Sequence, residues 1–340
     1  MSVTFEGAKI AKTLCGSKCL TYTRPAWQPK GVRRTNNDNS MNVLITGGTG
    51  LIGKRLSAML LEKGYSVSFL SRGKTDISGT IKTYHWNPEK GELDDTAIRN
   101  AHAIINLAGA SIADGRWTAK RKNEIYTSRT AGTMLLAHKL KELNHPLKVF
   151  VNASAVGFYG DKGGKWLTET DNSGNDFLAS VCKDWEAKAQ TVSALGIRTV
   201  ICRIGIVLAR EGGALPELEK SMRFGISAYL GDGRQYYSWI HLDDVCRIFI
   251  HALENEKMNG AYNAVGNNPV TNKELLRAIQ KAKGAHALTI TAPAFALKII
   301  LGEMSEAILG SQRCVNEKLG KLGFEFRFTN LQNALSALYA

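Results

Sequence analysis

Short apolar runs alternate with amphipathic segments along the chain from Met41 onward. The first apolar run, residues 43–45, leads through a glycine-rich turn into leucines and methionines at helical spacing, and Gly64 stands where a helix C-terminal cap belongs. Apolar and polar residues then alternate over residues 65–70, as they do in a strand. Together these segments predict a βαβ unit of about thirty residues.

The same alternation continues towards the C-terminus. It predicts strands at residues 81–86, 103–109, 149–154 and 198–204, and helices at residues 119–143, 177–195, 245–253 and 293–301. The last of these helices is expected in the core of a smaller domain rather than in the wall of a ligand site. Strands and helices that alternate at this length belong to the α/β class. They predict a Rossmann-type doubly wound parallel sheet with ligands at the carboxyl ends of its strands.

The turn after the first strand carries three glycines with the spacing Gly47-x-x-Gly50-x-x-Gly53. The first glycine permits a tight left-handed turn, the second lets the main chain approach a pyrophosphate, and the third lets the helix pack closely on the strand. The helix N-terminus presents free N–H groups and a partial positive charge to the phosphates. Chance spacings arise in a chain with 33 glycines. The flanking strand and helix nevertheless favour a dinucleotide-binding turn.

The end of the second strand indicates which dinucleotide is bound. NAD sites normally place Asp or Glu there to hold the ribose hydroxyls, whereas NADP sites place a cation near the 2′-phosphate. Here the chain reads Ser71-Arg72-Gly73-Lys74, and the first acid is Asp76. This pattern predicts NADP, with Arg72 at the 2′-phosphate and Ser71 as a hydrogen-bond donor. The alternative is a solvated basic turn.

Composition excludes several other classes of protein. No run of the 340 residues approaches the roughly 18–20 apolar residues that a membrane-spanning helix needs. The six cysteines are dispersed without CxxC spacing and are expected to be reduced, buried thiols. The seven histidines show no ligand spacing. We therefore expect no membrane partner and no metal.

The net charge of +14 raises the question of nucleic-acid binding. Residues 1–40 carry seven Lys or Arg against two acids, and the remaining excess is scattered, with no recognisable nucleic-acid-binding module. A basic surface that serves an anionic cofactor or substrate accounts for the charge more simply. We expect a small-molecule substrate and no nucleic-acid partner, and the sequence leaves the oligomeric state open.

Residues 1–40 form a basic N-terminal extension that is expected to be disordered or cleaved. It lacks the apolar core of a secretory signal. It is compatible with an organelle transit peptide, with a disordered tail, and with translation upstream of a true start at Met41. The expected location is the cytoplasm, or an organelle if the extension is a transit peptide.

Five motifs, in order along the chain, carry a family resemblance. They are Thr-Gly-Gly-Thr-Gly-Leu-Ile-Gly (46–53), Asn-Leu-Ala-Gly-Ala (106–110), Ser-Ala-Val-Gly-Phe-Tyr-Gly (154–160), Arg-Ile-Gly-Ile-Val-Leu (203–208) and Ser-Trp-Ile-His-Leu-Asp-Asp-Val (238–245). They resemble the landmarks of extended short-chain dehydrogenase/reductases in the NAD(P)-dependent epimerase/dehydratase superfamily. Residues 109–112, 116–117, 185–186, 212–215 and 231–235, with C-terminal motifs at 302–304, 310–313 and 323–326, are similar to its atypical "epimerase family protein" subgroup, also described as cell-division-inhibitor-like.

The resemblance implies two domains. We expect an NADP-binding Rossmann domain at residues 41–205 plus about 235–268, and a smaller substrate-side domain at about 206–234 plus 269–340. The implied cofactor contacts are Gly47, Thr49, Gly50, Leu51, Ile52, Gly53, Ser71, Arg72, Leu107, Ala108, Glu124 and Arg129. For the last two of these, an exposed helical ion pair is the alternative.

The family's chemistry depends on a Ser or Thr after the fifth strand and on a Tyr-x-x-x-Lys pair on the next helix. The tyrosine exchanges a proton with the substrate, and the lysine lowers the tyrosine's pKa. None of the ten tyrosines here is followed by lysine four residues later, and Val181 and Trp185 fall near the two positions. The atypical subgroup shares this substitution. It places ordinary dehydrogenase chemistry in doubt.

Other residues are candidates for the missing roles. Ser154 matches the family's hydroxyl, Tyr159 follows it closely, and Lys183 and Glu186 are weaker candidates. The alternatives are a strand-end cap for the serine, a packing aromatic for the tyrosine and solvation for the lysine. Candidate substrate contacts are Arg116, Trp117, Arg234, Gln235 and Trp239. His241 is expected to be structural, and Asp243 or Asp244 to cap the following helix.

The sequence therefore favours an NADP(H)-binding, oxidoreductase-like protein whose substrate is unidentified. A non-catalytic NADPH-binding regulator or redox sensor is the alternative, for which the missing Tyr-x-x-x-Lys pair is positive evidence. Nucleotide-sugar epimerisation has weaker support, because it needs the acid/base tyrosine.

Overall fold

The computed structural model describes residues 41–340, and the structural statements below refer to this part of the chain. The expectations for the N-terminal extension, Cys15 and Cys19 lie outside it.

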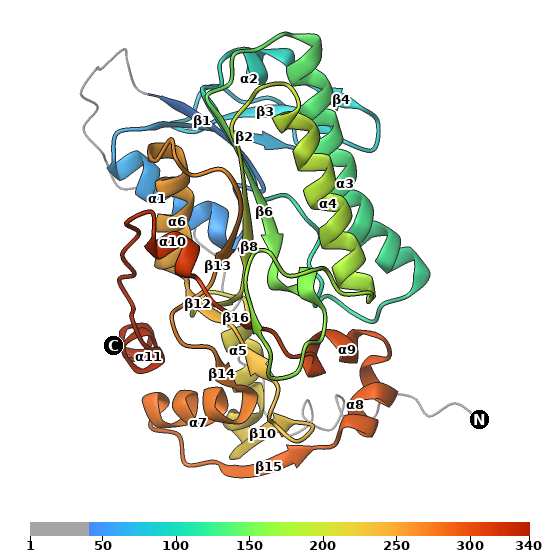
Figure 1. The fold of residues 1–340 in the computed structure, drawn as a ribbon, viewed down its shortest axis with the longest axis vertical. Helices are drawn as coiled ribbons and strands as arrows, with labels where there is room; N and C mark the ends of the chain where they lie inside the picture. The colour runs from blue at the N-terminus through green and yellow to red at the C-terminus, as the bar shows by residue number, and fades with distance from the viewer. Residues whose placement is uncertain (1–40) are drawn as a thin grey trace, which may run out of the picture. The chain divides into compact units, whose positions relative to one another are not determined.

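The main sheet confirms the expected fold class. Its strands are β1 (Asn42–Thr46), β2 (Ser66–Ser71), β3 (Lys82–Asn87), β4 (Glu92–Leu93), β5 (Ala103–Asn106), β6 (Val149–Ala155), β8 (Thr199–Ile204) and β13 (Gly260–Ala264). They lie in the order β13-β8-β6-β5-β1-β2-β3-β4 (Figure 1), and every pairing is parallel except that of β3 with β4. The strand order reverses between β1 and β5. In such sheets this switch point is where ligands bind, at the carboxyl ends of the strands.

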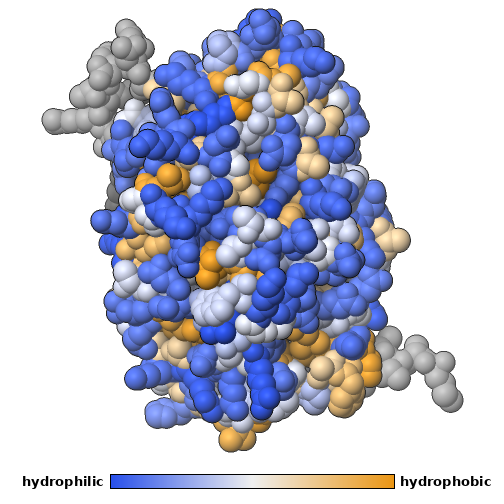
Figure 2. Space-filling model, in the orientation of Figure 1, coloured by the Kyte–Doolittle hydropathy of each residue, from blue (hydrophilic) through white to orange (hydrophobic). Residues whose placement is uncertain are grey.

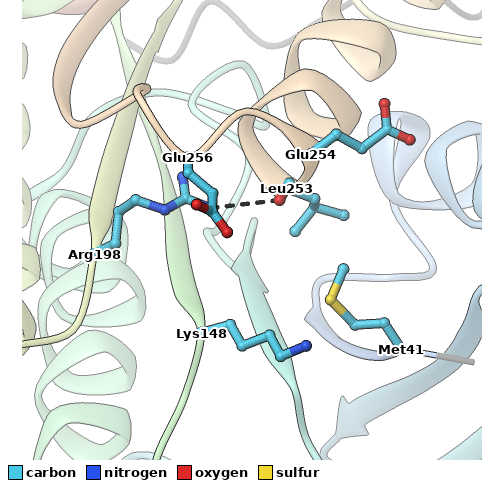
Figure 3. Close-up of a pocket in the computed structure, with 6 residues that line it drawn as sticks. All are labelled: Met41, Lys148, Arg198, Leu253, Glu254 and Glu256. Carbon is cyan, nitrogen blue, oxygen red and sulfur yellow. Dashed lines mark hydrogen bonds between the residues drawn. The ribbon is translucent and has the colours of Figure 1, made fainter. Parts of the chain in front are cut away.

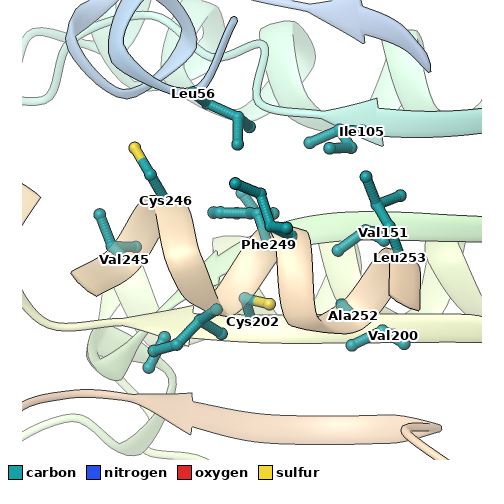
Figure 4. Packing of buried hydrophobic residues seen from close by; sticks show 14 of the residues in the cluster. Leu56, Ile105, Val151, Val200, Cys202, Val245, Cys246, Phe249, Ala252 and Leu253 are labelled. Atoms are coloured by element: carbon teal, nitrogen blue, oxygen red, sulfur yellow. The ribbon is translucent and has the colours of Figure 1, made fainter. Parts of the chain in front are cut away.

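Helices cover both faces of this sheet. One face carries α1 (Leu51–Glu62), α6 (Leu242–Glu254) and α10 (Glu317–Gly320); the other carries α2 (Asp95–Arg99), α3 (Ala119–Glu142) and α4 (Phe177–Ser193) (Figure 1). Alternate strand residues point to opposite faces, so Ile45 packs with Leu56 and Phe249 while Leu44 packs with Leu136. Figure 4 shows the first of these two apolar layers. Burial on both faces explains why the strands are nearly continuous apolar runs.

The strands outside the main sheet pair into two-stranded sheets beyond the carboxyl ends of the main strands. The remaining strands are β7 (Trp166–Leu167), β9 (Ile206–Leu208), β10 (Ile226–Leu230), β11 (Tyr236–Tyr237), β12 (Trp239–His241), β14 (Val270–Thr271), β15 (Leu288–Ala292) and β16 (Arg313–Cys314). The remaining helices are α5 (Ala214–Glu219), α7 (Asn272–Lys283), α8 (Ala294–Leu301), α9 (Met304–Leu309) and α11 (Leu331–Tyr339), with short 3₁₀ helices η2 (Val156–Tyr159) and η3 (Lys220–Phe224). The two-stranded sheets are β10-β15, β11-β14, β12-β9 and β16-β7.

Two expected elements differ from the structure. The strand predicted at residues 103–109 ends at Asn106. The Leu107 N–H is shared between the Thr46 carbonyl (3.2 Å) and the Thr46 hydroxyl (3.1 Å), and the Ala108 N–H donates to that hydroxyl. The segment predicted as a core helix does form α8, but this helix has no buried residue. Its core assignment was wrong, since Phe295 is 69 % exposed and Ile299 is 70 % exposed.

The N-terminus of α6 also corrects an expectation. Asp243 and Asp244 were both candidates to cap this helix, but the cap is His241, whose ring Nδ1 accepts the Asp243 N–H at 3.0 Å. Asp243 instead pairs with the Arg55 guanidinium at 2.7 Å. Asp244 is buried and accepts the main-chain N–H groups of Arg327 (2.9 Å) and Phe328 (3.0 Å). The expected structural role of His241 agrees with this geometry.

Cys182, Cys202, Cys246 and Cys314 are all free and buried, as expected. Among residues 41–340, no group of His, Cys, Asp and Glu could hold a metal ion. In the same range no helix combines the length and apolarity needed to cross a membrane.

Gly53 provides a test of the packing between α1 and β1. A Cβ atom there would lie 2.4 Å from the Gly47 carbonyl oxygen and 2.7 Å from the Gly48 Cα, both of them backbone atoms. We expect Gly53→Ala to lower the free energy of unfolding by roughly 1–3 kcal/mol in urea titrations, because the backbone must move apart. The control is Gly320→Ala, since nothing lies within 4 Å of its Cβ position. Equal stabilities for the two variants would contradict this account.

Candidate functional site

The glycine turn leaves a cradle at the carboxyl end of β1. Gly47 has φ +68°, and a Cβ atom there would lie 3.0 Å from the carbonyl group of Leu107. Gly50 is the N-cap residue of α1 and supplies no side-chain hydrogen bond to the first turn. The N–H groups of that turn therefore face outward without a side-chain acceptor, next to the exposed Thr49. This arrangement suits an anion such as a pyrophosphate.

A buried polar cluster holds the neighbouring strand ends in place. The Thr46 hydroxyl donates to Asn106 Oδ1 (2.6 Å) and accepts the N–H groups of Leu107 (3.1 Å) and Ala108 (3.0 Å). Asn106 Nδ2 donates to Asn152 Oδ1, 2.7 Å away on β6. The cluster fixes the carboxyl ends of β1, β5 and β6, together with the backbone of the two residues expected at the ribose.

The end of β2 presents a cation without a competing acid. Arg72 is exposed, and Ser71 is half-buried with its hydroxyl accepting the Gly73 N–H at 3.3 Å. The nearest acid along the chain, Asp76, accepts hydrogen bonds from the Ser78 hydroxyl and N–H, which lower its pKa. The carboxylate that an NAD site uses at this position is therefore absent from β2 and its following turn. The residues fit a 2′-phosphate.

Arg129 on α3 is a guanidinium with no carboxylate partner among the described residues. It donates to the carbonyl groups of Ala110 (3.1 Å) and Ile125 (3.0 Å), and burial lowers its pKa. The alternative of an exposed helical ion pair holds for Glu124, which pairs with Arg121 at 2.6 Å, but not for Arg129. Arg129 therefore keeps a positive charge beside the loop that follows β5, where an anionic ligand would stabilise it.

Ser154 lies in a buried ionic network. Its hydroxyl donates to Glu186 Oε1 at 2.6 Å, and the same carboxylate receives the Arg203 guanidinium at 2.8 and 2.9 Å. Burial alone would lower the pKa of Arg203, but the paired carboxylate of Glu186 outweighs it and raises that pKa above its usual value. The Cys182 thiol also contacts Ser154, and burial raises the pKa of this thiol to about 11. Because the serine proton already points at Glu186, the free lone pairs of Ser154 make it an acceptor.

Tyr159 belongs to the same network, in a position that argues against its proposed acid role. It is fully buried, donates to Asn263 Oδ1 at 2.7 Å and accepts from Arg203 Nη1 at 3.0 Å. Burial raises its pKa above the usual tyrosine value. Its hydroxyl already has protein partners on both sides, which favours the alternative of a packing aromatic for Tyr159.

The positions of the family's Tyr-x-x-x-Lys pair are filled by core residues. Val181 is 1 % exposed and Trp185 is 5 % exposed. The Trp185 indole N–H donates to the Thr133 hydroxyl at 3.0 Å, and the ring lies beneath the Arg129 guanidinium. Lys183, which lies between Val181 and Trp185 on this helix, is exposed. The helix therefore offers no proton-exchanging pair towards the carboxyl edge.

The candidate substrate contacts divide into two groups. Trp117, Gln235 and Trp239 are buried, and their polar groups donate to the main-chain carbonyls of Ile112, Leu230 and Asn268 respectively. Arg116 and Arg234 are exposed. Only the two arginines are free to meet a ligand without rearrangement.

Sequence reasoning missed the partners of these residues. Arg203 is a charged residue within an otherwise apolar strand, and Asn106 and Asn152 interrupt two more apolar runs. Polar residues at such positions must find partners when they are buried. This signal indicated buried networks but did not identify which side chains would meet.

A surface pocket lies elsewhere in the described part of the chain. It measures about 520 Å³ and is lined by Met41, Lys148, Arg198, Leu253, Glu254 and Glu256 (Figure 3). These residues lie at the amino ends of β1, β6 and β8 and at the end of α6, so the pocket is at the opposite edge from the glycine turn. The Arg198 guanidinium is already committed to the carbonyls of Ala252 (2.8 Å) and Met258 (3.0 Å).

The fold and the glycine cradle define a nicotinamide-dinucleotide-binding Rossmann protein. Comparison with known proteins agrees: residues 43–265 match the model of the NAD dependent epimerase/dehydratase family, and residues 292–338 match a domain of unknown function. The chain belongs to the NAD-dependent epimerase/dehydratase family, as an atypical extended short-chain dehydrogenase/reductase of the "epimerase family protein" group.

Individual relatives agree with this assignment. An epimerase family protein of Mycobacterium leprae is 36 % identical over 295 residues, which cover 86 % of this chain and 94 % of that protein. The crystal structure of human epimerase family protein SDR39U1 with NADPH superposes with a TM-score of 0.78 at 28 % identity, covering 88 % of this chain and 99 % of that one. A nucleoside-diphosphate sugar epimerase from Corynebacterium glutamicum gives a TM-score of 0.72 at 32 % identity, covering 88 % of this chain and 58 % of that one.

The buried ionic network predicts a large effect of removing one charge. We expect Glu186→Gln to lower the free energy of unfolding by roughly 3–5 kcal/mol, because it leaves the Arg203 guanidinium buried without a counter-charge. The double variant Glu186→Met/Arg203→Met removes both charges and is the control, which we expect to lose less stability than the single variant. Urea unfolding of the three proteins measures both effects. A single variant as stable as the wild type would contradict the assigned pairing.

Proposed function

We propose that the protein binds NADP(H) at the carboxyl edge of its main sheet and functions as an oxidoreductase-like protein. The observation that carries the proposal is the end of β2, where Arg72 is exposed and has no acid partner within residues 41–340. An adenosine 2′-phosphate would supply the missing counter-charge. The human relative SDR39U1 was crystallised with NADPH, which supports the same choice of cofactor.

The remaining cofactor contacts follow from position in the fold. Residues 47–53 would hold the pyrophosphate at the N-terminus of α1, where the first-turn N–H groups lack a side-chain acceptor. The backbone of Leu107 and Ala108, fixed by the Thr46 hydroxyl, would lie along the nicotinamide ribose. Arg129 would place its unpaired charge next to that loop, whereas Glu124 is engaged by Arg121.

The bound nicotinamide would supply hydride transfer between its C4 atom and a carbinol or carbonyl carbon. Ser154 is the chain's own candidate for the substrate oxygen. Because its proton is donated to Glu186, the serine is set to accept a hydrogen bond from a substrate hydroxyl and to pass its own proton to the carboxylate. Polarising a carbonyl oxygen would instead require the serine proton to turn away from Glu186.

A specific observation favours the second candidate, a non-catalytic NADPH-binding regulator. The helix that carries the family's proton-exchanging pair presents buried Val181 and Trp185 instead, and the nearby Tyr159 is enclosed. Such a protein would bind cofactor without turning it over. Nucleotide-sugar epimerisation, suggested by the name of the Corynebacterium glutamicum relative, has less support because it needs the acid/base tyrosine.

The choice of cofactor can be tested by titrating NADPH and NADH against purified protein. We expect NADPH to bind more tightly, and Arg72→Ala to weaken NADPH binding by roughly 10- to 100-fold with little effect on NADH, because a charge-assisted contact is lost. Arg99→Ala, an exposed arginine at the end of α2, is the matched control. Tighter binding of NADH by the wild type would overturn the assignment.

Turnover separates the two candidate functions. A panel of carbonyl and carbinol compounds is screened for oxidation of NADPH or reduction of NADP. If the protein is an enzyme, we expect Ser154→Ala to reduce turnover by roughly 10²- to 10⁴-fold without weakening NADPH binding. Tyr159→Phe is the control and should retain turnover. NADPH binding without turnover of any compound would favour the regulator.

A further inference from the structure

The small sheet formed by β10 and β15 has its apolar side facing solvent. Its strands run parallel, with Ile226 beside Leu288 and Ala228 beside Ile290. The alternate residue Ser227 is buried, 1 % exposed, on the side that packs against α7. Leu288 is 72 % exposed and Ile290 is 39 % exposed on the opposite side. On β15 the threonines are exposed as well, so this strand leaves in solvent the apolar residues that a sheet normally buries.

Neighbouring segments extend the apolar surface. Phe224, which is 84 % exposed, lies just before the residue whose carbonyl accepts the Leu288 N–H. Helix α8 begins two residues after β15 and exposes Phe295, Ile299 and Ile300. Figure 2 shows hydrophobic surface at the lower end of the view, where Figure 1 places β10, β15 and α8.

The outer edge of β15 is also open. In the described part of the chain β15 pairs only with β10, and the N–H of Leu288 and the carbonyl of Ala292 both point towards that strand. In a parallel ladder the alternate residues Thr289 and Thr291 then direct their main-chain groups outward. Natural edge strands are commonly guarded by charged residues. Residues 284–297 contain no Lys, Arg, Asp or Glu.

We propose that this edge is the dimerisation surface of the protein and that its occupant is a second copy of the same chain. The sequence Leu-Thr-Ile-Thr-Ala of β15 has the same polarity pattern in both directions. A two-fold axis through Ile290 therefore pairs Thr289 with Thr291 of the second copy and Leu288 with Ala292 of the second copy. All apolar side chains then share one face, and the outward main-chain groups of both threonines become hydrogen-bonded.

The same geometry disfavours other occupants. Immersion in a membrane would leave the outward N–H and C=O groups of Thr289 and Thr291 without partners in lipid, which is costly. A charged partner surface finds no counter-charge on the strand. An isologous pair places no like charges opposite each other and brings the start of α8 beside the start of β15 of the second copy. The proposal does not depend on the cofactor or on turnover.

The test is a charge-swap experiment on the full chain, read by sedimentation velocity or light scattering over a concentration series. We expect a dimer for the wild type, and monomers for Ile290→Lys and for Ile290→Glu, because each places two like charges at the two-fold axis. An equimolar mixture of these two variants should regain the dimer through opposite charges. Ile77→Lys is the matched control, since Ile77 is 63 % exposed in the turn after β2, and it should remain dimeric.

Circular dichroism melting checks that each variant is folded, and a second measurement covers variants that are not. Ile290→Cys should form a disulfide-linked dimer on oxidation, because residues directly opposite at a non-hydrogen-bonded position have Cα atoms about 4.5 Å apart. Thr289→Cys, whose opposite residue is Thr291, should crosslink far less, and the wild type should not crosslink. A wild type that stays monomeric at concentrations on the order of 100 μM, or a dimer that survives both charged variants, would overturn the proposal.

Discussion

The hydrogen bonds of the Asn106 side chain hold the carboxyl ends of β1 and β5 at the point where the two chain segments separate. Its amide links the Thr46 hydroxyl on one side to Asn152 on the other, at the point where the strand order reverses. The carboxyl ends of three adjacent parallel strands, β6, β5 and β1, are thereby linked to one another. The Thr46 hydroxyl in turn accepts the N–H groups of the two residues that follow β5, the first of which it shares with the Thr46 carbonyl. Both walls of the dinucleotide cradle, the glycine turn and the loop after β5, depend on this one buried arrangement.

The atypical character of the site follows from a change of interaction on α4. A Tyr-x-x-x-Lys helix directs a phenol and an ammonium group at the cofactor, whereas this helix directs Trp185 into the core and Glu186 onto Arg203. The polar group that would exchange protons with a substrate is therefore replaced by a closed ionic network. Ser154 is the member of this network that lies on β6, near the carboxyl end of that strand. The family's fold and glycine turn are kept, while the positions of its proton-exchanging pair are filled by buried residues.

The sequence predicted the periodic features well. Most of the helices and strands that were predicted, including the first βαβ unit, emerged within one or two residues, because apolar periodicity reflects burial on one face or on both. The short strands and helices outside the main sheet, such as β10, β15 and α9, were not predicted. The α/β class followed from the order of the predicted elements. Predictions failed where a side chain accepts main-chain N–H groups at the end of an element, as the Thr46 hydroxyl does for residues 107 and 108, and as His241 does at the start of α6. The spacing of residues alone does not show which side chain will accept these N–H groups.

The site was predictable to the same degree. The glycine turn and Arg72 each follow a recognisable strand of the first βαβ unit, so the known pattern of that unit predicted their roles. Glu186 and Arg203 lie 17 residues apart, and Tyr159 is 44 residues from Arg203, so only the folded sheet shows that they meet. Because the hydrogen-bond partners of Tyr159 are also distant in the sequence, the sequence did not show that this residue is buried. A hydroxyl that follows a strand end can point to the cleft or into the core, and the sequence is equally compatible with both.

Asp244 gives the C-terminal segment an unexpected importance. Its carboxylate is 1 % exposed and accepts the main-chain N–H groups of residues 327 and 328. The last stretch of chain is therefore not an appendage that follows a finished fold. Without Arg327 and Phe328, Asp244 would lose both of these hydrogen bonds and keep its contact with the Arg247 guanidinium, 3.1 Å away on α6. Helix α6 packs against α1, the helix that follows the glycine turn. The end of the chain thus supports the packing behind that turn, although the two segments lie at opposite ends of the described sequence.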